Sequence, residues 1–222
     1  MERLKLLDLF CCAGGAGMGY AQAGFDVTGV DIVPRPRYPF AFVQADVLTL
    51  DPEWVAGFDA IHASPPCQAH SALKSMHNAK DHPDLVPQTR AMLVASGRPW
   101  IIENVVGAPL INPITLCGTM FGLGTGDAEL RRHRLFEMSH PPALTPQCTH
   151  RKARVIGVYG GHGRDRRRVH NTQDFSTAQR AEAMGIDWMT GAELSQAIPP
   201  AYTEWLGRHL LAVALHARQQ VA

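Results

Sequence analysis

The chain has 222 residues, of which 45% are hydrophobic and 18% are charged. This globular composition argues against an intrinsically disordered chain, and the length fits one α/β domain with a small lobe. No apolar run approaches the ~20 residues of a membrane span, and the formal net charge of +1 does not by itself indicate a partner. We expect a cytoplasmic monomer that contacts no membrane.

Five cysteines are spread through the chain: Cys11, Cys12, Cys67, Cys117 and Cys148. They are too sparse for a disulfide scaffold and are typical of a reducing compartment. Cys148, His150 and His140 raise the alternative of a structural zinc site. Because the C-x-H spacing is poor and only three ligands are in view, the sequence predicts no metal.

The first half of the chain alternates predicted strands and helices. Leu4–Phe10 has the pattern of a buried strand, and a glycine-rich turn and a short helix follow it. The later predicted strands and helix are Val27–Val30, Phe40–Ala45, Phe58–Ala63, Leu85–Ala95 (the helix) and Trp100–Val105. This alternation predicts βαβ units, a parallel sheet and the α/β class.

The second half is less regular. Beyond Pro109 the apolar runs are short, at Leu116–Leu123, Leu135–Met138 and Val155–Tyr159. A final helix is predicted to begin near Tyr202, where apolar residues recur at helical spacing. We therefore expect a small irregular C-terminal lobe and a closing helix.

Basic residues concentrate in residues 150–170, which we call the basic segment. It contains one acid, Asp165, and seven basic residues: Arg151, Lys152, Arg154, Arg164, Arg166, Arg167 and Arg168. Such a concentration is what attraction to a phosphate backbone requires. A solvated surface loop is the alternative.

Glycines at positions 15, 17 and 19 follow the first predicted strand. Their spacing is not that of the dinucleotide fingerprint, but glycines let a ligand approach the backbone closely, and the next helix offers its N–H groups. Asp31, at the end of the next strand, is placed to accept hydrogen bonds from a ribose. The pattern predicts a nucleoside-bearing cofactor at the carboxyl edge of the sheet, with a plain tight turn as the alternative.

Ser64-Pro65-Pro66-Cys67-Gln68 ends the fourth predicted strand. Two prolines stiffen the backbone and hold the following thiol in one direction. A structural cysteine is more typical of a strand interior. Cys67 is therefore a candidate nucleophile at the same edge as the predicted cofactor.

Glu103 ends the fifth predicted strand, where partial desolvation would raise its pKa and let it hold a proton near neutrality. Arg132 and Arg134 alternate ahead of an apolar run, so both would project from one face as a pair of donors. In a parallel sheet, Cys67 and Glu103 would reach the same crevice. A solvated strand end and an ordinary charged edge are the alternatives.

Several motifs, in this order along the chain, resemble the cytosine-C5 DNA methyltransferase family. They are Asp8-Leu9-Phe10 with Gly14-Gly15, Ser64-Pro65-Pro66-Cys67-Gln68, Glu103-Asn104-Val105, and Leu116-Cys117-Gly118 with Phe121-Gly122-Leu123. The likeness covers residues 4 to about 137 and is loose beyond them. It implies a Rossmann-like S-adenosylmethionine-dependent fold with helices on both faces of the sheet. It also implies methyl transfer to C5 of cytosine in DNA.

The resemblance implies the catalytic roles. Cys67 would add to C6 of the cytosine, and Glu103 would protonate N3. Arg132 and Arg134 look like the family's paired arginines, with Arg134 facing O2 of the cytosine. The residues that would bind S-adenosylmethionine are Phe10, Gly14, Gly15, Asp31, Asp46 and Pro65.

The resemblance also implies that the target base is flipped out of the duplex. The loop after Cys67, with Ser71 and Lys74, would close over the base. The predicted nucleic-acid contacts of the basic segment are Arg164, Arg166, Arg167 and Arg168.

The chain departs from the family pattern at several positions. Ser64 and His70 stand where the family has glycine and an aromatic residue, and Leu130 stands where it has glutamine. Ser195-Gln196 replaces the family's Gly-Asn near the C-terminus. These changes keep open the alternative of a non-catalytic nucleic-acid-binding relative.

The predicted domains are a methyltransferase core at 1–137, a reduced basic recognition segment at 138–197 and a C-terminal helix at 198–222 that packs back on the core. About 60 residues between Phe136 and Ile198 are too few for the family's usual target-recognition domain. We therefore expect short or weak sequence specificity. RNA, such as a tRNA, is the alternative substrate. The biological role, such as restriction–modification, stays open.

Overall fold

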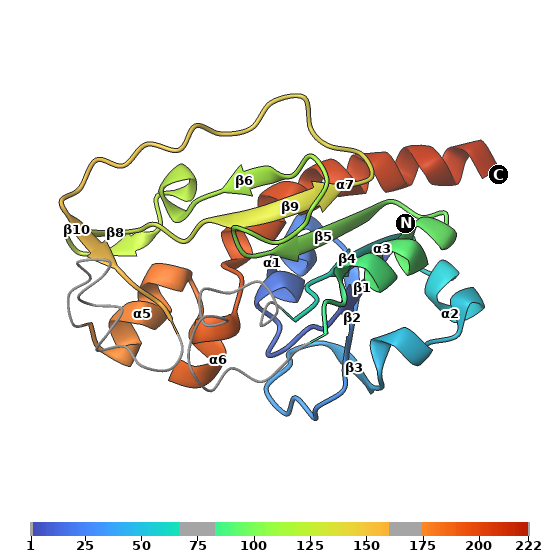
Figure 1. Ribbon diagram of the computed structural model, residues 1–222, viewed down its shortest axis with the longest axis horizontal. Helices are drawn as coiled ribbons and strands as arrows, with labels where there is room; N and C mark the ends of the chain where they lie inside the picture. Colours follow the sequence, from blue (N-terminus) through green and yellow to red (C-terminus); the bar gives the residue numbers. More distant parts are fainter. Residues whose placement is uncertain (1, 67–82, 160–174, 222) are drawn as a thin grey trace.

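The computed structural model describes residues 2–66, 83–159 and 175–221. Seven strands form the main sheet in the order β3-β2-β1-β4-β5-β9-β6 (Figure 1). These strands are β1 Lys5–Leu9, β2 Asp26–Asp31, β3 Ala41–Gln44, β4 Ala60–Ala63, β5 Trp100–Asn104, β6 Ile114–Leu116 and β9 Arg134–Met138. The first five are parallel, whereas β9 runs antiparallel to both β5 and β6.

The order of the parallel strands reverses between β1 and β4. The chain passes from β1 outward through β2 to β3 and then returns to β4 on the other side of β1. In open α/β sheets, ligands bind beyond the carboxyl ends of the strands at such a reversal point. The strand order therefore predicts a ligand site at the carboxyl ends of β1, β2, β4 and β5.

Helices cover both faces of the sheet, as the sequence predicts. α1 (Gly15–Ala23) and α7 (Pro200–Val221) share a core with Leu6 of β1, and the opposite face packs Leu7 against residues of α2 (Pro52–Ala56) and α3 (Val86–Ala95). Because consecutive side chains of a strand point to opposite faces, the apolar run of β1 supplies both cores. The α/β class is confirmed.

Glycines let α1 and α7 pack closely. A methyl group at Gly19 would collide with the backbone carbonyl of Pro200 and the hydroxyl of Thr203, and one at Gly207 would lie 2.7 Å from the Cβ atom of Ala23. Tight packing against α7 therefore accounts for Gly19, which the sequence alone places in a ligand-binding pattern. No helix in the described part of the chain is both long and apolar enough to cross a membrane.

A second sheet of three strands, in the order β10-β8-β7, forms a small lobe with α5 and α6. Its elements are β7 Gly124–Thr125, β8 Ala128–Leu130, β10 Arg154–Ile156, α5 Thr177–Met184 and α6 Gly191–Gln196. Leu130, Ile156, Met184 and Leu194 are buried in its core. The sequence predicts a domain boundary at residue 137. The small lobe contains residues from both sides of that boundary, because β7 and β8 precede it and β10, α5 and α6 follow it. Short 3-10 helices, η1 (Val47–Thr49) and η3 (Gly118–Phe121), complete the described elements.

Asp8 is a buried carboxyl group near the carboxyl end of β1. It accepts a hydrogen bond from the Tyr38 hydroxyl at 3.1 Å, and burial raises its pKa from 3.8 to about 7. The folded protein therefore binds a proton that the unfolded chain releases between these two values. Stability should fall as the pH rises through this window.

Replacing Asp8 with Asn should remove this loss of stability at higher pH, because the amide does not ionise. The amide oxygen can still accept the hydrogen bond from the Tyr38 hydroxyl. We expect the stability advantage of the Asp8→Asn protein over the wild type to grow by about 2 kcal/mol between pH 5 and pH 8. Urea unfolding of both proteins at the two pH values measures the difference. An advantage that stays constant with pH would show that Asp8 ionises in the native state near its ordinary pKa.

Candidate active site

Glu103 lies at the carboxyl end of β5 and is 6% exposed. Burial raises its pKa, and the positive charges of Arg134 and Arg132 and a hydrogen bond from Ser64 oppose the rise. The Arg134 Nε atom lies 3.1 Å from the carboxylate. The site thus holds a carboxyl group that is drawn toward the protonated state but has a cationic partner when it ionises.

A buried chain of hydrogen bonds runs behind Glu103. The Tyr20 hydroxyl lies 2.9 Å from Nδ1 of His62, and Nε2 of His62 lies 2.8 Å from the Ser64 hydroxyl, which bonds Glu103. Burial lowers the pKa of His62 to about 3, so the ring stays neutral. The neutral ring hydrogen-bonds the Tyr20 hydroxyl at one nitrogen and the Ser64 hydroxyl at the other. Ser64, which stands where the resembled family has glycine, therefore connects this chain of hydrogen bonds to Glu103 and opposes the rise of its pKa. Neither Tyr20 nor His62 belongs to a motif that the sequence singles out.

Asn104 anchors the segment that leads to Cys67. Its side-chain amide donates to the carbonyl of Pro65 at 3.1 Å, and its Oδ1 atom accepts the N–H of Val105. Both Asn104 and Pro65 are buried. The ends of β4 and β5 are thus tied together two residues before Cys67, while Cys67 itself, with Ser71 and Lys74, lies outside the described residues.

The two predicted arginines have different environments. Arg134 pairs with Glu103, whereas the buried guanidinium of Arg132 donates to the backbone carbonyls of Val158 and Ser195. Burial lowers the pKa of Arg132 to about 9, which still leaves it charged at neutral pH. Arg132 therefore ties the small lobe to the core. The sequence predicts that Arg132 and Arg134 project from one strand face as a pair of donors, whereas in the structure they contact different groups.

The turn after β1 has an unusual backbone. Phe10 and Cys12 have φ values of 57° and 47°, a region that non-glycine residues rarely adopt, and Gly14 has φ 84°. Strained residues of this kind cluster at ligand sites. A side chain at Gly15 would collide with the carbonyl of Ile198, so close packing accounts for that glycine independently of any ligand.

Asp31 holds this turn in place at the end of β2. One carboxylate oxygen accepts the N–H of Cys12 at 3.0 Å, and the other accepts the N–H of Val33 at 3.0 Å. The Arg35 guanidinium forms an ion pair with the carboxylate and donates one hydrogen bond to it, at 3.2 Å. A ribose would have to share the carboxylate with Arg35. Asp46, which follows β3 and is exposed, caps η1 by accepting the N–H of Leu48.

The C-terminal part of the chain returns to the turn after β1. The indole N–H of Trp188 donates to the carbonyl of Ala13 at 2.8 Å, and the Gln196 amide oxygen lies 3.7 Å from the sulfur of Cys12. The segment around Ser195 and Gln196 therefore lies beside the turn after β1, where the sequence predicts the cofactor.

Acidic side chains of β8 and of the residue before it contact the described part of the basic segment. Glu129 accepts the backbone N–H groups of Arg151 and Lys152, and Asp127 pairs with Arg154. Only the second of these contacts pairs charged side chains, because the Glu129 carboxylate forms its ion pair with Arg131, outside the basic segment. Arg164, Arg166, Arg167 and Arg168 lie outside the described residues.

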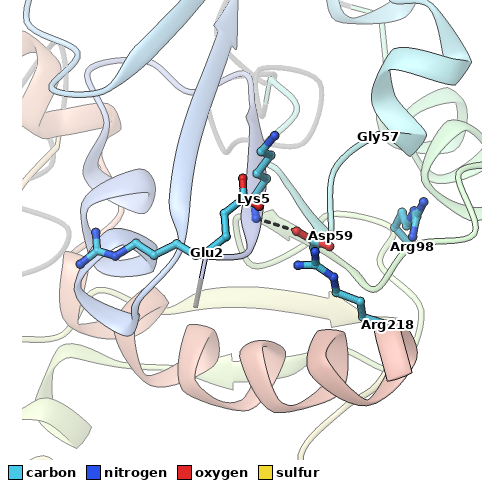
Figure 2. A pocket seen from close by; sticks show the side chains of 7 residues that line it. Glu2, Lys5, Gly57, Asp59, Arg98 and Arg218 are labelled. Atoms are coloured by element: carbon cyan, nitrogen blue, oxygen red, sulfur yellow. Dashed lines mark hydrogen bonds between the residues drawn. The ribbon is translucent and has the colours of Figure 1, made fainter. Parts of the chain in front are cut away.

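A pocket lies at the opposite edge of the sheet, near the amino ends of β1 and β4 (Figure 2). Its lining residues are Glu2, Arg3, Lys5, Gly57, Asp59, Arg98 and Arg218. The Lys5 backbone N–H donates to Asp59 there. None of the predicted site residues lines this pocket.

Two solved structures share this fold along nearly the whole chain. The S. pombe Dnmt2 methyltransferase has a TM-score of 0.58 and 14% identity, covering 95% of this chain and 99% of its own. The Entamoeba histolytica methyltransferase EhMeth has a TM-score of 0.60 and 12% identity, covering 96% and 99%. The chain has their fold. At such low identity the likeness extends to the fold alone.

Among curated proteins, the type II methyltransferase M.AgeI of Thalassovita gelatinovora is 30% identical over 121 residues. The match spans 47% of this chain and 28% of that protein. No protein-family model matches the sequence.

Replacing Ser64 with Ala should raise the pKa of Glu103, because the hydroxyl hydrogen bond favours the ionised carboxylate. Carbon-13 NMR titration of the Glu103 carboxyl group in the two proteins measures the shift. Ser64→Thr, which keeps a hydroxyl, is the matched control and should titrate close to the wild type. An unchanged or lowered pKa in Ser64→Ala would rule out the hydrogen bond.

Proposed function

We propose that this chain transfers a methyl group from S-adenosylmethionine to C5 of cytosine in DNA. The observation that carries the proposal is the placement of Glu103: a buried carboxyl group with a raised pKa, paired with Arg134, beside the Pro65 segment that precedes Cys67. The likeness to a type II methyltransferase and to the folds of two methyltransferases supports the same reaction class.

The cofactor would bind beyond the ends of β1, β2 and β3. S-adenosylmethionine supplies a methyl group on a positively charged sulfur. Phe10, Gly14 and Gly15 border the turn where it would lie, and Asp31 would accept ribose hydroxyls once Arg35 shares or releases its carboxylate. Asp46, exposed after β3, is available for the adenine amino group, and Pro65 borders the same edge. The strained turn and a carboxylate at the tip of β2 fit such a ligand.

Cys67 and Glu103 would activate the cytosine together. The Cys67 thiolate adds its electron pair to C6 while the Glu103 carboxyl gives its proton to N3, so negative charge does not accumulate on the ring. C5 then has enamine character and takes the methyl group. Water removes the C5 proton, the C6–sulfur bond breaks, and the N3 proton returns to Glu103. Arg134 would stabilise the ionised Glu103 and face O2, and Arg132 would position Arg134 from the small-lobe side.

The substrate must present an unstacked cytosine, because C5 and C6 must meet groups on both sides of the ring. The loop after Cys67, with Ser71 and Lys74, would close over that base. Arg164, Arg166, Arg167 and Arg168 would contact phosphates. With a small lobe of three short strands and two helices, we propose short or weak sequence specificity on the part of a monomeric enzyme.

A covalent trap tests the chemistry. Oligonucleotides containing 5-fluorocytosine should form a stable adduct in the presence of S-adenosylmethionine, because fluorine at C5 cannot leave as a proton. The adduct should map to Cys67 by peptide mass spectrometry and disappear in Cys67→Ala. Glu103→Gln should slow methyl transfer by about 10²–10⁴-fold.

The matched control is Glu137→Gln, which alters a buried glutamate on the next strand that pairs with Arg90. It should affect stability more than the rate of methyl transfer. The trap is run with DNA and with RNA. An adduct with RNA alone would move the proposal to RNA, and no adduct with either, from protein that binds both ligands, would favour a non-catalytic relative.

Neutralising Arg166, Arg167 and Arg168 together should weaken DNA binding and lower the slope of log K against log salt by up to about 3, since each arginine would neutralise one phosphate. Fluorescence anisotropy across a salt series measures both effects. The control removes the same number of positive charges from Arg3, Lys5 and Arg218, which are exposed and line the pocket near the amino ends of β1 and β4. Equal weakening in both triple variants would argue against a DNA-binding surface in the basic segment.

A further inference from the structure

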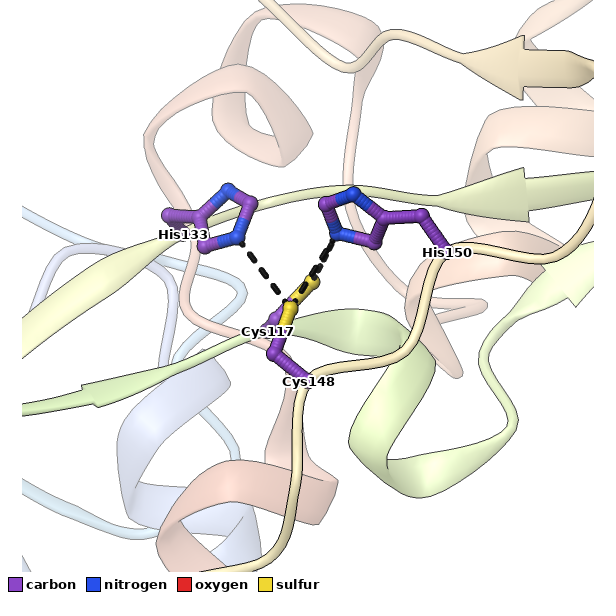
Figure 3. Close-up of side chains that lie close together, drawn as sticks. All are labelled: Cys117, His133, Cys148 and His150. Atoms are coloured by element: carbon purple, nitrogen blue, oxygen red, sulfur yellow. Dashed lines mark hydrogen bonds between the residues drawn. The ribbon is translucent and has the colours of Figure 1, made fainter.

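Four metal-ligand side chains meet where the main sheet joins the small lobe. They are Cys117, His133, Cys148 and His150, and their ligand atoms all lie within 4.8 Å of one another (Figure 3). The two imidazole rings approach the two sulfur atoms from opposite sides. Cys117 is buried, His133 is half-buried, and the other two are exposed.

The distances match one tetrahedral centre. A zinc ion with Zn–S of about 2.3 Å and Zn–N of about 2.0 Å places sulfur and nitrogen about 3.5 Å apart. Cys117 Sγ lies 3.5 Å from His150 Nε2, and Cys148 Sγ lies 3.5 Å from His133 Nε2 and 3.1 Å from His150 Nε2. Each pair also lies within hydrogen-bonding distance, but a shared cation explains why four metal-ligand groups from three segments of the chain gather within 4.8 Å of one another.

We propose that these four residues bind one structural zinc ion. Two thiolates and two imidazoles are the ligand set that favours zinc, and a full set of four protein ligands is typical of a structural site. The Thr119 hydroxyl lies 3.3 Å from Cys117 Sγ and can donate to it as an outer partner. This proposal departs from the sequence prediction of no metal. That prediction considered His140, which instead lies against Ser139, and it had no means of including Cys117 and His133.

The ion would fix a long connection of the fold. Residues 139–153 run from β9 to β10 without regular structure and arch away from the sheet (Figure 1). They contain three prolines, and Leu144 is 85% exposed. Cys148 and His150 would fasten this connection to the end of β6 and to the β8–β9 link. A metal that closes loops of this length restricts the unfolded chain and so stabilises the fold.

The ion would also support the candidate active site. His133 stands between Arg132, which holds the small lobe, and Arg134, which pairs with Glu103. A metal bond to the His133 ring restricts the backbone from which both arginines extend. The proposal itself concerns metal binding and does not depend on methyl transfer.

Metal content is the first test. The full chain, purified without chelators from zinc-supplemented cells, should contain about one zinc ion per molecule by plasma mass spectrometry. Cys148→Ser and His150→Ala, both exposed positions, should each lose most of it. His140→Ala is the matched control and should keep the metal.

Cobalt substitution and thermal unfolding give readouts that do not depend on the variants folding. The wild-type protein with Co²⁺ should show the intense visible bands of a tetrahedral site and a thiolate charge-transfer band. A strong chelator should lower its melting temperature, and Zn²⁺ but not Mg²⁺ should restore it. Absence of zinc together with an octahedral cobalt spectrum would overturn the proposal. So would equal metal loss in His140→Ala and Cys148→Ser.

Discussion

The ion pair between Glu103 and Arg134 is the interaction on which the candidate site depends. It exists because β9 is antiparallel to β5: the first residue of β9 then lies at the edge where β5 ends, just beyond the pairing of Asn104 with Leu135. Were β9 parallel, its arginine would lie at the opposite edge. Since burial alone favours a neutral carboxyl, the arginine gives Glu103 access to both protonation states, which any proton-transfer role requires.

Around this pair, buried polar contacts join parts of the chain that are distant in sequence. Asn104 ties β5 to the Pro65 segment, and Ser64 connects Glu103 to His62 and Tyr20. On the other side, Tyr202 of α7 donates to the carbonyl of Arg132. Polar groups removed from water are costly unless they are bonded, so these contacts favour one arrangement of the strand ends around Glu103 over others.

The proposed zinc site would give the small lobe a second attachment to the core. Arg132 already reaches the lobe through the carbonyls of Val158 and Ser195, and the four metal ligands would hold the connection that leads into β10. Leu130 packs in the small lobe that Arg132 and the proposed zinc ion attach to the core. The residue that stands in place of a glutamine is buried in the core of the small lobe, where a polar amide would need partners.

The sequence by itself determined the strand-and-helix alternation, the faces of β1, and the placement of Asp31, Pro65 and Glu103 at one edge, because period-two apolar runs and strand-ending motifs are local signals. It did not predict the partners of Arg132, the contacts of Glu129 with the basic segment, or the meeting of Cys117 and His133 with Cys148 and His150. Those depend on an antiparallel β9 and on a second sheet built from β7, β8 and β10. Only the tertiary structure decides such contacts, because residues far apart in the chain become neighbours through strand order and packing, and no spacing along the sequence records that order.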